Sequence, residues 1–190
     1  MTTGQAASVT DTPELVKTFE DAMVTLKRSL KPAMALSSEI STRLQPRATA
    51  DGLRKHTAAF LDLMSQRSLI LGDVVETCRR IDEVATETLN IARVSVWLLA
   101  DDKSKISCID LFERKEAKHS AGVELFAKDF APYFNALATE RTIAAHDAQT
   151  DPRTSCFTQV YLKPLGITSM LDVPVWVGRK MVGVVCHEHL

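Results

Sequence analysis

The residues best suited to chemistry stand together near the end of the sequence, in Cys186-His187-Glu188-His189. They follow an apolar, β-branched run that predicts a strand, and the side chains of a strand alternate between its two faces. His187 and His189 would therefore share one face. Two imidazoles in this relation can chelate a transition metal if a third ligand comes from elsewhere. The candidates for that third ligand are His146, Asp147 and Cys156.

The same four residues also have a purely structural interpretation. A cysteine in an apolar strand usually behaves as a small buried hydrophobic residue, so Cys186 would pack in the core. His187 would then line a pocket without metal, and Glu188 and His189 would be solvated at the edge of the fold. Because the sequence does not locate a third ligand, we predict no metal site and retain His187 as a pocket residue.

A second polar cluster occupies residues 146–154 and mixes an imidazole, carboxylates and a guanidinium. Such groups near a helix N-terminus could serve acid–base catalysis or phosphate binding. A structural role explains them equally: Asp151 would cap a helix, and Arg153 would pair with Asp147 or Asp151 to hold the loop. We favour the structural role and expect His146 to line the pocket.

The sequence carries no motif for catalysis. It has no Gly-x-Ser-x-Gly nucleophile motif, and its seven glycines form no phosphate-binding loop. The cysteines at 78, 108, 156 and 186 include no Cys-x-x-Cys pair, which favours reduced thiols over disulfides or a redox centre. We therefore predict that this chain is not an enzyme.

Charge and hydropathy argue against two classes of partner. The 190 residues carry a formal net charge of −1, so no excess of positive charge is available for nucleic acid or an anionic membrane surface. No apolar run reaches the roughly 20 residues of a membrane helix, and the first residues lack the pattern of a signal peptide. We expect a cytoplasmic protein with neither nucleic-acid nor membrane partners.

The elements that must position these residues fall into two parts. Residues 1–12 are small and polar and predict a disordered leader. Residues 13–70 predict a helical extension, because apolar residues recur there at helical spacing. Pro32 should kink the first helix, and the clearest break falls at Pro46 and residues 48–52.

The helical stripes also suggest a role in assembly. Apolar residues at helical spacing run through 13–44 and again through 53–89. Such stripes can form a bundle between two subunits, so we expect a homodimer made through the N-terminal helices. Asp73 should cap the helix that follows it.

Residues 71–190 predict an α+β domain. Two hairpins are expected, from 94–99 with 106–112 and from 171–177 with 182–187. Two short helices, 129–137 and one starting at Asp151, lie between them in the sequence. Simple alternation in the first hairpin places four residues on one face: Ile106, Cys108, Asp110 and Phe112.

This order of elements resembles a GAF domain. The resemblance is carried by Ala-Arg-Val-Ser-Val-Trp-Leu at 92–98, Ala-Ala-His-Asp at 144–147 with Thr-Asp-Pro-Arg-Thr at 150–154, and Tyr-Leu at 161–162 through Gly-Ile-Thr-Ser-Met-Leu-Asp-Val-Pro at 166–174. These stretches are similar to the GAF sensor modules of bacterial histidine kinases and cyclic-di-GMP regulators. The resemblance implies a twisted antiparallel sheet with helices on one face. On the other face it implies a ligand pocket roofed by the inserted helices.

The resemblance also implies that more protein follows. GAF domains of this kind usually close with a helix after the last strand, and an output domain comes next. We therefore expect residues 71–190 to be a GAF domain truncated before its C-terminal helix. The parent would be a longer bacterial signalling protein carrying a histidine kinase or diguanylate cyclase. The helices of residues 13–66 would cover the surface that the missing helix leaves open.

The closing segment is similar as well to the GAF domain of phytochromes, in which the histidine matching His187 faces a linear tetrapyrrole. The sequence departs from that family at three positions. Thr158 replaces a histidine, Phe157 stands where some members carry the covalent cysteine, and Asp172 replaces a hydroxyl near a chromophore propionate. These departures argue against a bilin, and the sequence names no other cofactor.

We interpret the chain as a non-catalytic sensory domain that binds a small molecule, dimerises, or does both to control an output domain. A bilin-binding or metal-binding sensor and a purely dimerising module are the alternatives. The residues expected to line the pocket are Trp97, Cys108, Asp110, His146, Tyr161, Ser169, Asp172 and His187.

Overall fold

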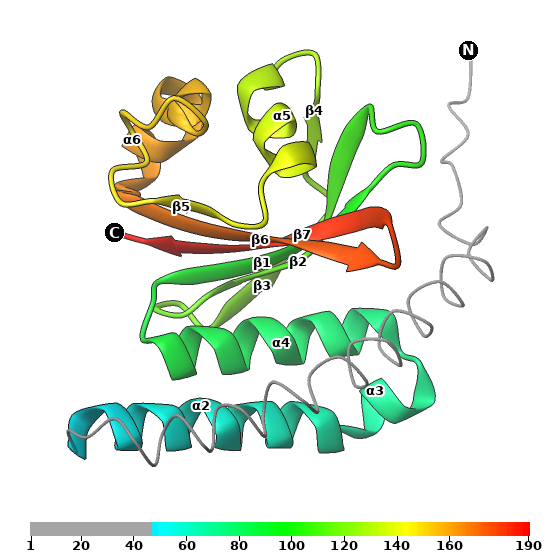
Figure 1. The fold of residues 1–190 in the computed structure, drawn as a ribbon, viewed down its shortest axis with the longest axis vertical. Helices are drawn as coiled ribbons and strands as arrows, with labels where there is room; N and C mark the ends of the chain where they lie inside the picture. The colour runs from blue at the N-terminus through cyan, green and yellow to red at the C-terminus, as the bar shows by residue number, and fades with distance from the viewer. Residues whose placement is uncertain (1–46) are drawn as a thin grey trace.

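The computed structural model describes residues 47–190 (Figure 1). The predicted leader, the Pro32 kink and the greater part of the 13–70 extension lie outside the described residues. Three helices open the described part: α2 (Arg47–Ser65), α3 (Arg67–Leu71) and α4 (Val74–Leu89). The predicted cap of α4 is confirmed, because the Asp73 carboxylate accepts the backbone N–H of Glu76 at 3.0 Å.

The predicted break began at Pro46, which lies outside the described residues. Its remaining part, at residues 48–52, is wrong because α2 runs through it without interruption. A single glycine inside a helix costs only about 1 kcal/mol relative to alanine, so Gly52 by itself does not end a helix. Packing of α2 against α4 offsets that cost. Tertiary contact thus outweighs the local signal for a turn.

Seven strands form one antiparallel sheet, which confirms the predicted α+β fold class. The strands of the two expected hairpins are β1 (Arg93–Leu99) with β2 (Lys105–Glu113) and β6 (Ser169–Val177) with β7 (Lys180–His189). Three shorter strands were not predicted: β3 (Lys118–Ser120), β4 (Glu124–Phe126) and β5 (Ile143–Ala145). The strand order is β3-β2-β1-β7-β6-β5, and β4 pairs with β2 outside that path.

A bulge in β2 overturns the predicted alternation of the first hairpin. Val96 pairs with Asp110 but Trp97 pairs with Cys108, so Ile109 is an extra residue with no partner on β1. An inserted residue shifts the facing of every side chain beyond it. Asp110 therefore faces the helix side of the sheet, and Cys108 stays on the side of Trp97.

The two faces of the sheet are covered by different helices. Helix α4 packs on β1 and β2, and α2 packs on the outer side of α4. The opposite face carries α5 (Ala131–Thr139) and α6 (Lys163–Leu165), as Figure 1 shows. This arrangement agrees with the predicted layers, helices on one face and the inserted segments on the other.

The second inserted segment differs from the single helix predicted from Asp151. Its chain makes a turn, then a 3₁₀ helix at Ser155–Phe157 and a π-helical turn at Thr158–Leu162 that leads into α6. The turn is held locally, because the Asp151 carboxylate accepts the backbone N–H of Arg153 at 2.9 Å. π-helical turns are rare and occur frequently at functional sites.

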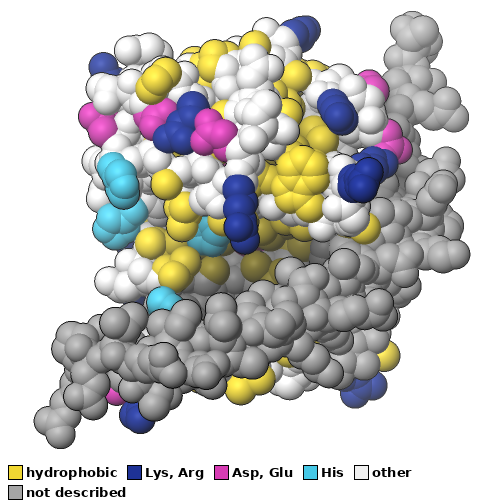
Figure 2. Space-filling view, viewed as in Figure 1, with side chains coloured by type: hydrophobic (Ala, Val, Ile, Leu, Met, Phe, Trp, Pro, Cys, Tyr) yellow, Lys and Arg dark blue, Asp and Glu magenta, His cyan; other side chains and the backbone are white. Residues whose placement is uncertain are grey.

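The surface of the described part has a mixed character. On the face drawn in Figure 2, acidic and basic side chains are interspersed with hydrophobic ones. Within residues 47–190, no helix combines the length and the apolar character needed to cross a bilayer. The four cysteines, all of them within this part, are free thiols, as predicted.

Candidate functional site

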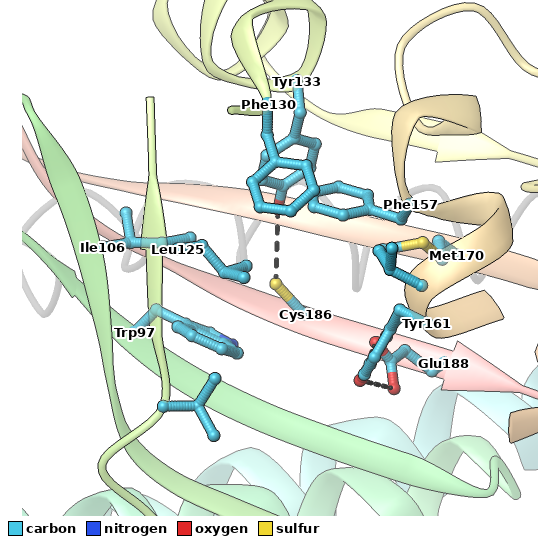
Figure 3. A pocket seen from close by; sticks show the side chains of 12 residues that line it. Trp97, Ile106, Leu125, Phe130, Tyr133, Phe157, Tyr161, Met170, Cys186 and Glu188 are labelled. Carbon is cyan, nitrogen blue, oxygen red and sulfur yellow. Dashed lines mark hydrogen bonds between the residues drawn. The ribbon is translucent and has the colours of Figure 1, made fainter. Parts of the chain in front are cut away.

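A cavity of about 160 Å³ lies between the sheet and the inserted segments (Figure 3). Its floor comes from β1, β2, β6 and β7, and its roof from α5 and the 3₁₀ and π-helical turns. Ten of its twelve lining side chains are labelled in Figure 3. The lining residues are Trp97, Ile106, Val123, Leu125, Phe130, Tyr133, Phe157, Val160, Tyr161, Met170, Cys186 and Glu188.

Aromatic rings form much of the cavity wall. Phe130 and Phe157 stack with ring centroids 4.5 Å apart, and Tyr133 meets the edge of Phe157 at 4.9 Å. Trp97 faces them from β1, with its indole N–H donated to the Ser95 hydroxyl at 2.8 Å. Because the indole N–H is already bonded, Trp97 presents an apolar ring to the cavity.

One end of the cavity is polar, because the carboxylate of Glu188 lies there (Figure 3). The Tyr161 hydroxyl donates to Glu188 at 2.8 Å from one oxygen and 2.9 Å from the other. The Arg93 guanidinium lies 3.5 Å from Glu188 and 3.7 Å from Glu113. Burial raises the pKa of Glu188, and Arg93 and Tyr161 act in the opposite direction. The expected solvation of Glu188 at the rim is therefore wrong.

A second buried carboxyl lies just outside the wall. Tyr133 donates its hydroxyl to Asp172 at 2.6 Å and lies 3.5 Å from the sulfur of Cys186. Burial raises the pKa of Asp172 to about 7, although the hydrogen bond from Tyr133 favours the ionised form. Burial also raises the pKa of Cys186 well above its usual value. A thiol held protonated in this way is a poor nucleophile.

The structure brings some of the predicted pocket residues together at this cavity. Trp97 and Tyr161 line it. Cys108 and Asp172 are buried next to lining residues, since Cys108 pairs with Trp97 across β1 and β2 and Asp172 bonds to Tyr133. These four residues thus belong to the cavity or its immediate support.

The other four predicted residues lie elsewhere. His187 lies between Cys186 and Glu188, which line the cavity, so its side chain faces the opposite side of β7. Its Nδ1 forms a hydrogen bond with the Leu171 carbonyl at 2.8 Å. Asp110 is turned away by the bulge in β2. His146 is exposed, and Ser169 lies at the start of β6 on the face opposite Met170. Sequence reasoning assigned polar types to the pocket, whereas apolar residues make most of it.

The polar cluster at residues 146–154, considered for chemistry, has a structural role. Arg153 pairs with Asp151 at 2.6 Å and with Glu140 at 2.7 Å, which pins the loop before the 3₁₀ turn. The Arg153 hydrogen bond lowers the pKa of Asp151. Within residues 47–190, no three His, Cys, Asp or Glu side chains come together in a way that could hold a metal ion.

A third polar cluster, which sequence reasoning missed, lies between α4 and the sheet. Asp82 of α4 is fully buried, and neither of its carboxyl oxygens has a hydrogen-bond partner among the described residues. Burial and the neighbouring Asp110 carboxyl raise the pKa of Asp82 to about 9. Asp110 is held in turn by His119 at 2.6 Å and Arg79 at 3.7 Å. With its pKa raised to this value, Asp82 would keep its proton at neutral pH.

The antiparallel sheet, the helical layer on one face and the roofed cavity on the other define a small α+β domain with an internal cavity. The GAF domain family model matches residues 73–189, so the chain belongs to the GAF domain family, as the sequence predicted. GAF domains are generally non-catalytic sensory and regulatory modules. A search among curated proteins gave no sequence match.

Solved structures share the fold at low sequence identity. The GAF domain of the phosphoenolpyruvate-protein phosphotransferase from Acinetobacter aligns with a TM-score of 0.52 and 14% identity, over 73% of this chain and 76% of that one. The equivalent domain from Coxiella burnetii gives 0.54 and 13%, over 73% and 77%. The phycocyanobilin-bound GAF domain of a cyanobacterial phytochrome gives 0.52 and 16%, over 77% and 81%.

Proposed function

We propose that this chain is the sensory part of a cytoplasmic bacterial signalling protein and that its cavity binds a small molecule. Occupancy of the cavity would control an output domain in the same polypeptide, such as a histidine kinase or a diguanylate cyclase. The observation that carries the proposal is the cavity itself: a roofed space of about 160 Å³ with aromatic walls and one buried carboxylate. Apolar cavities with a few placed polar groups are typical ligand sites.

The proposal includes a route from the cavity to the helices. Strand β1 carries Trp97 in the cavity wall, and its alternate residues Val94 and Val96 are buried on the opposite face, where α4 packs. A ligand that shifts β1 would therefore change the packing of α4. A ligand can bias this packing only as far as it binds one arrangement better than the other.

A tetrapyrrole fits this proposal poorly. An engineered cavity of about 150 Å³ holds a single benzene ring, and the present cavity is of similar size. Four linked pyrrole rings would not fit without opening the roof. Phe157 packs on Phe130, and the Thr158 hydroxyl is engaged by the Gln149 carbonyl at 2.7 Å. We therefore propose a smaller ligand than the bilin held by the phytochrome neighbour.

Screening the intact chain against a fragment collection by ligand-observed NMR is expected to give hits at the cavity. Val123→Trp should weaken those hits at least tenfold, because Val123 is exposed at the cavity rim and an indole there would cover the opening. Bound fragments should also slow amide exchange in α4. Val173→Trp is the matched control, since Val173 is exposed on the opposite face of β6 from Met170. Equal loss of binding in both variants would contradict the proposed site.

We propose in addition that the N-terminal helices join two chains. The described helices of this region carry apolar side chains that are largely exposed, although folded proteins gain stability by burying such groups. They are Leu61 at 55% exposure, Leu71 at 68%, Val75 at 50% and Leu89 at 42%. If ligand binding in the cavity changes the packing of helices in the dimer interface, the binding and dimerising roles would be parts of one mechanism.

The double substitution Leu61→Glu with Val75→Glu is expected to raise the dimer dissociation constant at least tenfold. Charges at positions that are exposed in one chain should leave its fold intact, but they would be costly inside a subunit interface. Light scattering of the full chain over a range of concentrations measures this. Leu165→Glu, at a similarly exposed apolar position on α6, should leave the dimer unchanged. A wild-type chain that stays monomeric would refute the dimer.

A further inference from the structure

The hydrogen bonding of Glu188 leaves part of its carboxylate free toward the cavity. A tyrosine hydroxyl has one hydrogen, so Tyr161 can fill only one of the roughly four acceptor positions of a carboxylate, although it lies near both oxygens. The closest guanidinium nitrogen of Arg93, at 3.5 Å, is too far away for a strong hydrogen bond. Glu188 is nevertheless only 3% exposed, so water reaches it poorly. A hydrogen-bond donor on a ligand would complete this site.

The charges around the cavity decide the charge of that ligand. The guanidinium of Arg93 lies against the buried carboxylate of Glu188 and, at 3.7 Å, against the carboxylate of Glu113. Glu113 is partly exposed and screened by solvent, so the buried Glu188–Arg93 pair by itself is close to neutral. A cation is therefore not required. An anion would meet Glu188 directly, and Asp172 lies behind the wall with Tyr133. Like charges in a buried, low-dielectric site repel strongly.

The volume and the walls of the cavity determine the size and the aromatic character of the ligand. A volume of about 160 Å³ suits one aromatic ring or a small fused pair. Rings of Trp97, Phe130 and Phe157 offer faces and edges for such a ligand, and aromatic pairs gain about 0.5–1.5 kcal/mol beyond their buried area. The polar end is confined to Glu188 and Tyr161.

From these features we infer that the ligand is a compact, uncharged aromatic molecule with an N–H or O–H donor that binds the carboxylate of Glu188. This inference rests on the proposed function and names the chemical class that the cavity accepts. It separates this cavity from sites for cyclic nucleotides and tetrapyrroles, whose phosphate or propionate groups are anionic. The Tyr161 hydroxyl would share Glu188 with the ligand donor, which ties occupancy to the π-helical turn at Thr158–Leu162.

Three probes with one ring each test the class on the intact protein: phenol, anisole and benzoate. Phenol carries the donor, anisole has the same ring and oxygen without the hydrogen, and benzoate is the anion. Calorimetry should show phenol binding at least tenfold more tightly than anisole, because a hydrogen bond to a charged acceptor contributes about 1.5–3 kcal/mol. Benzoate should not bind detectably. Methyl resonances of Ile106 and Met170 should shift with phenol.

Two variants keep the test specific to Glu188. Glu188→Gln should reduce the preference for phenol over anisole to less than threefold, since an amide oxygen is a weaker acceptor than a carboxylate. Tyr161→Phe keeps the ring but removes the other hydrogen-bond donor to the carboxylate, so that Glu188 depends more on the ligand donor. It should tighten phenol binding about threefold or more and leave anisole unchanged. This second variant protects the test if Glu188→Gln disturbs folding.

The outcomes separate the two levels of the proposal. Anisole binding as tightly as phenol, or benzoate binding best, would overturn the ligand class. If other fragments occupy the cavity and no probe of this series does, the class is likewise wrong while the binding function stands. If no molecule of any kind binds the wild-type chain, the proposed function itself fails.

Discussion

Replacing Asp82 with asparagine is expected to raise the free energy of unfolding, and the gain over wild type should be about 4 kcal/mol larger at pH 8 than at pH 5. Asp82 is fully buried between α4 and the sheet, and neither of its oxygens has a hydrogen-bond partner within residues 47–190. The folded state holds the Asp82 proton up to about pH 9. An amide of the same shape needs no proton and can donate to Asp110.

The direction of the effect follows from the proton count. An aspartate in the unfolded chain releases its proton near pH 4, at about 3.9. Between that pH and about 9, the folded state therefore holds one more proton than the unfolded state. The free energy of unfolding must then fall as pH rises through this window. Above the pKa of Asp82 in the folded state, this residue causes no further decrease in the free energy of unfolding.

Urea unfolding of both proteins at pH 5 and pH 8 measures this difference. The comparison between wild type and variant isolates Asp82 from the other buried carboxyls, Asp172 and Glu188, which titrate in both proteins. Asp129→Asn makes the same chemical change at an exposed position and should alter stability by less than about 0.5 kcal/mol. A variant no more stable than wild type at pH 8 would show that Asp82 is not held protonated.

Gly183→Ala is expected to lower the free energy of unfolding by about 3 kcal/mol or more. Gly183 lies in the central β7 strand, paired with Leu98 of β1. A Cβ at this position would overlap the carbonyl oxygen of Trp97, which belongs to the backbone of the neighbouring strand. Neither strand can move aside, because β1 is also paired with β2 and β7 with β6. The substitution would therefore break pairing in the middle of the sheet.

Gly52→Ala is the same chemical change as Gly183→Ala, but it is expected to stabilise the protein. Gly52 stands inside α2, and nothing in the described part of the chain lies within 4 Å of a Cβ built there. Alanine in a helix interior is more favourable than glycine by about 0.5–1 kcal/mol, so this variant should be more stable than wild type. Thermal and urea unfolding of both variants test the pair. Equal changes in stability at the two positions would mean that the close approach of β1 is not the reason why glycine is needed at position 183.

The mutants bear on function as well as stability. Trp97 forms part of the cavity wall, so disturbing its backbone through Gly183→Ala should also impair ligand binding. Asp82→Asn leaves the cavity residues untouched and changes only the α4 side of the sheet. Comparing fragment binding in the two variants therefore tests whether the cavity face can be perturbed separately from the helix face.

Local sequence features predicted much of the fold. Asp73 is an effective helix cap because its carboxylate reaches the N–H of Glu76, three residues along the same chain. The two hairpins are set by β-branched runs and short turns, which also act over a few residues. Strands β3, β4 and β5 were missed, since three residues are too few to display an alternating pattern. The GAF family assignment rested on stretches spread over the domain, and it is confirmed.

The orientation of side chains was decided by tertiary structure. The sequence by itself determined that His187 and His189 share one face of a strand and that Cys186 and Glu188 share the other, because alternation is a property of the strand. The pairing of β7 with β1 and β6 decides which face of the strand lines the cavity. In this structure it is the face that carries Cys186 and Glu188. The bulge at Ile109 likewise moved Asp110 beside Asp82. Both outcomes depend on contacts between distant segments, which no local pattern encodes.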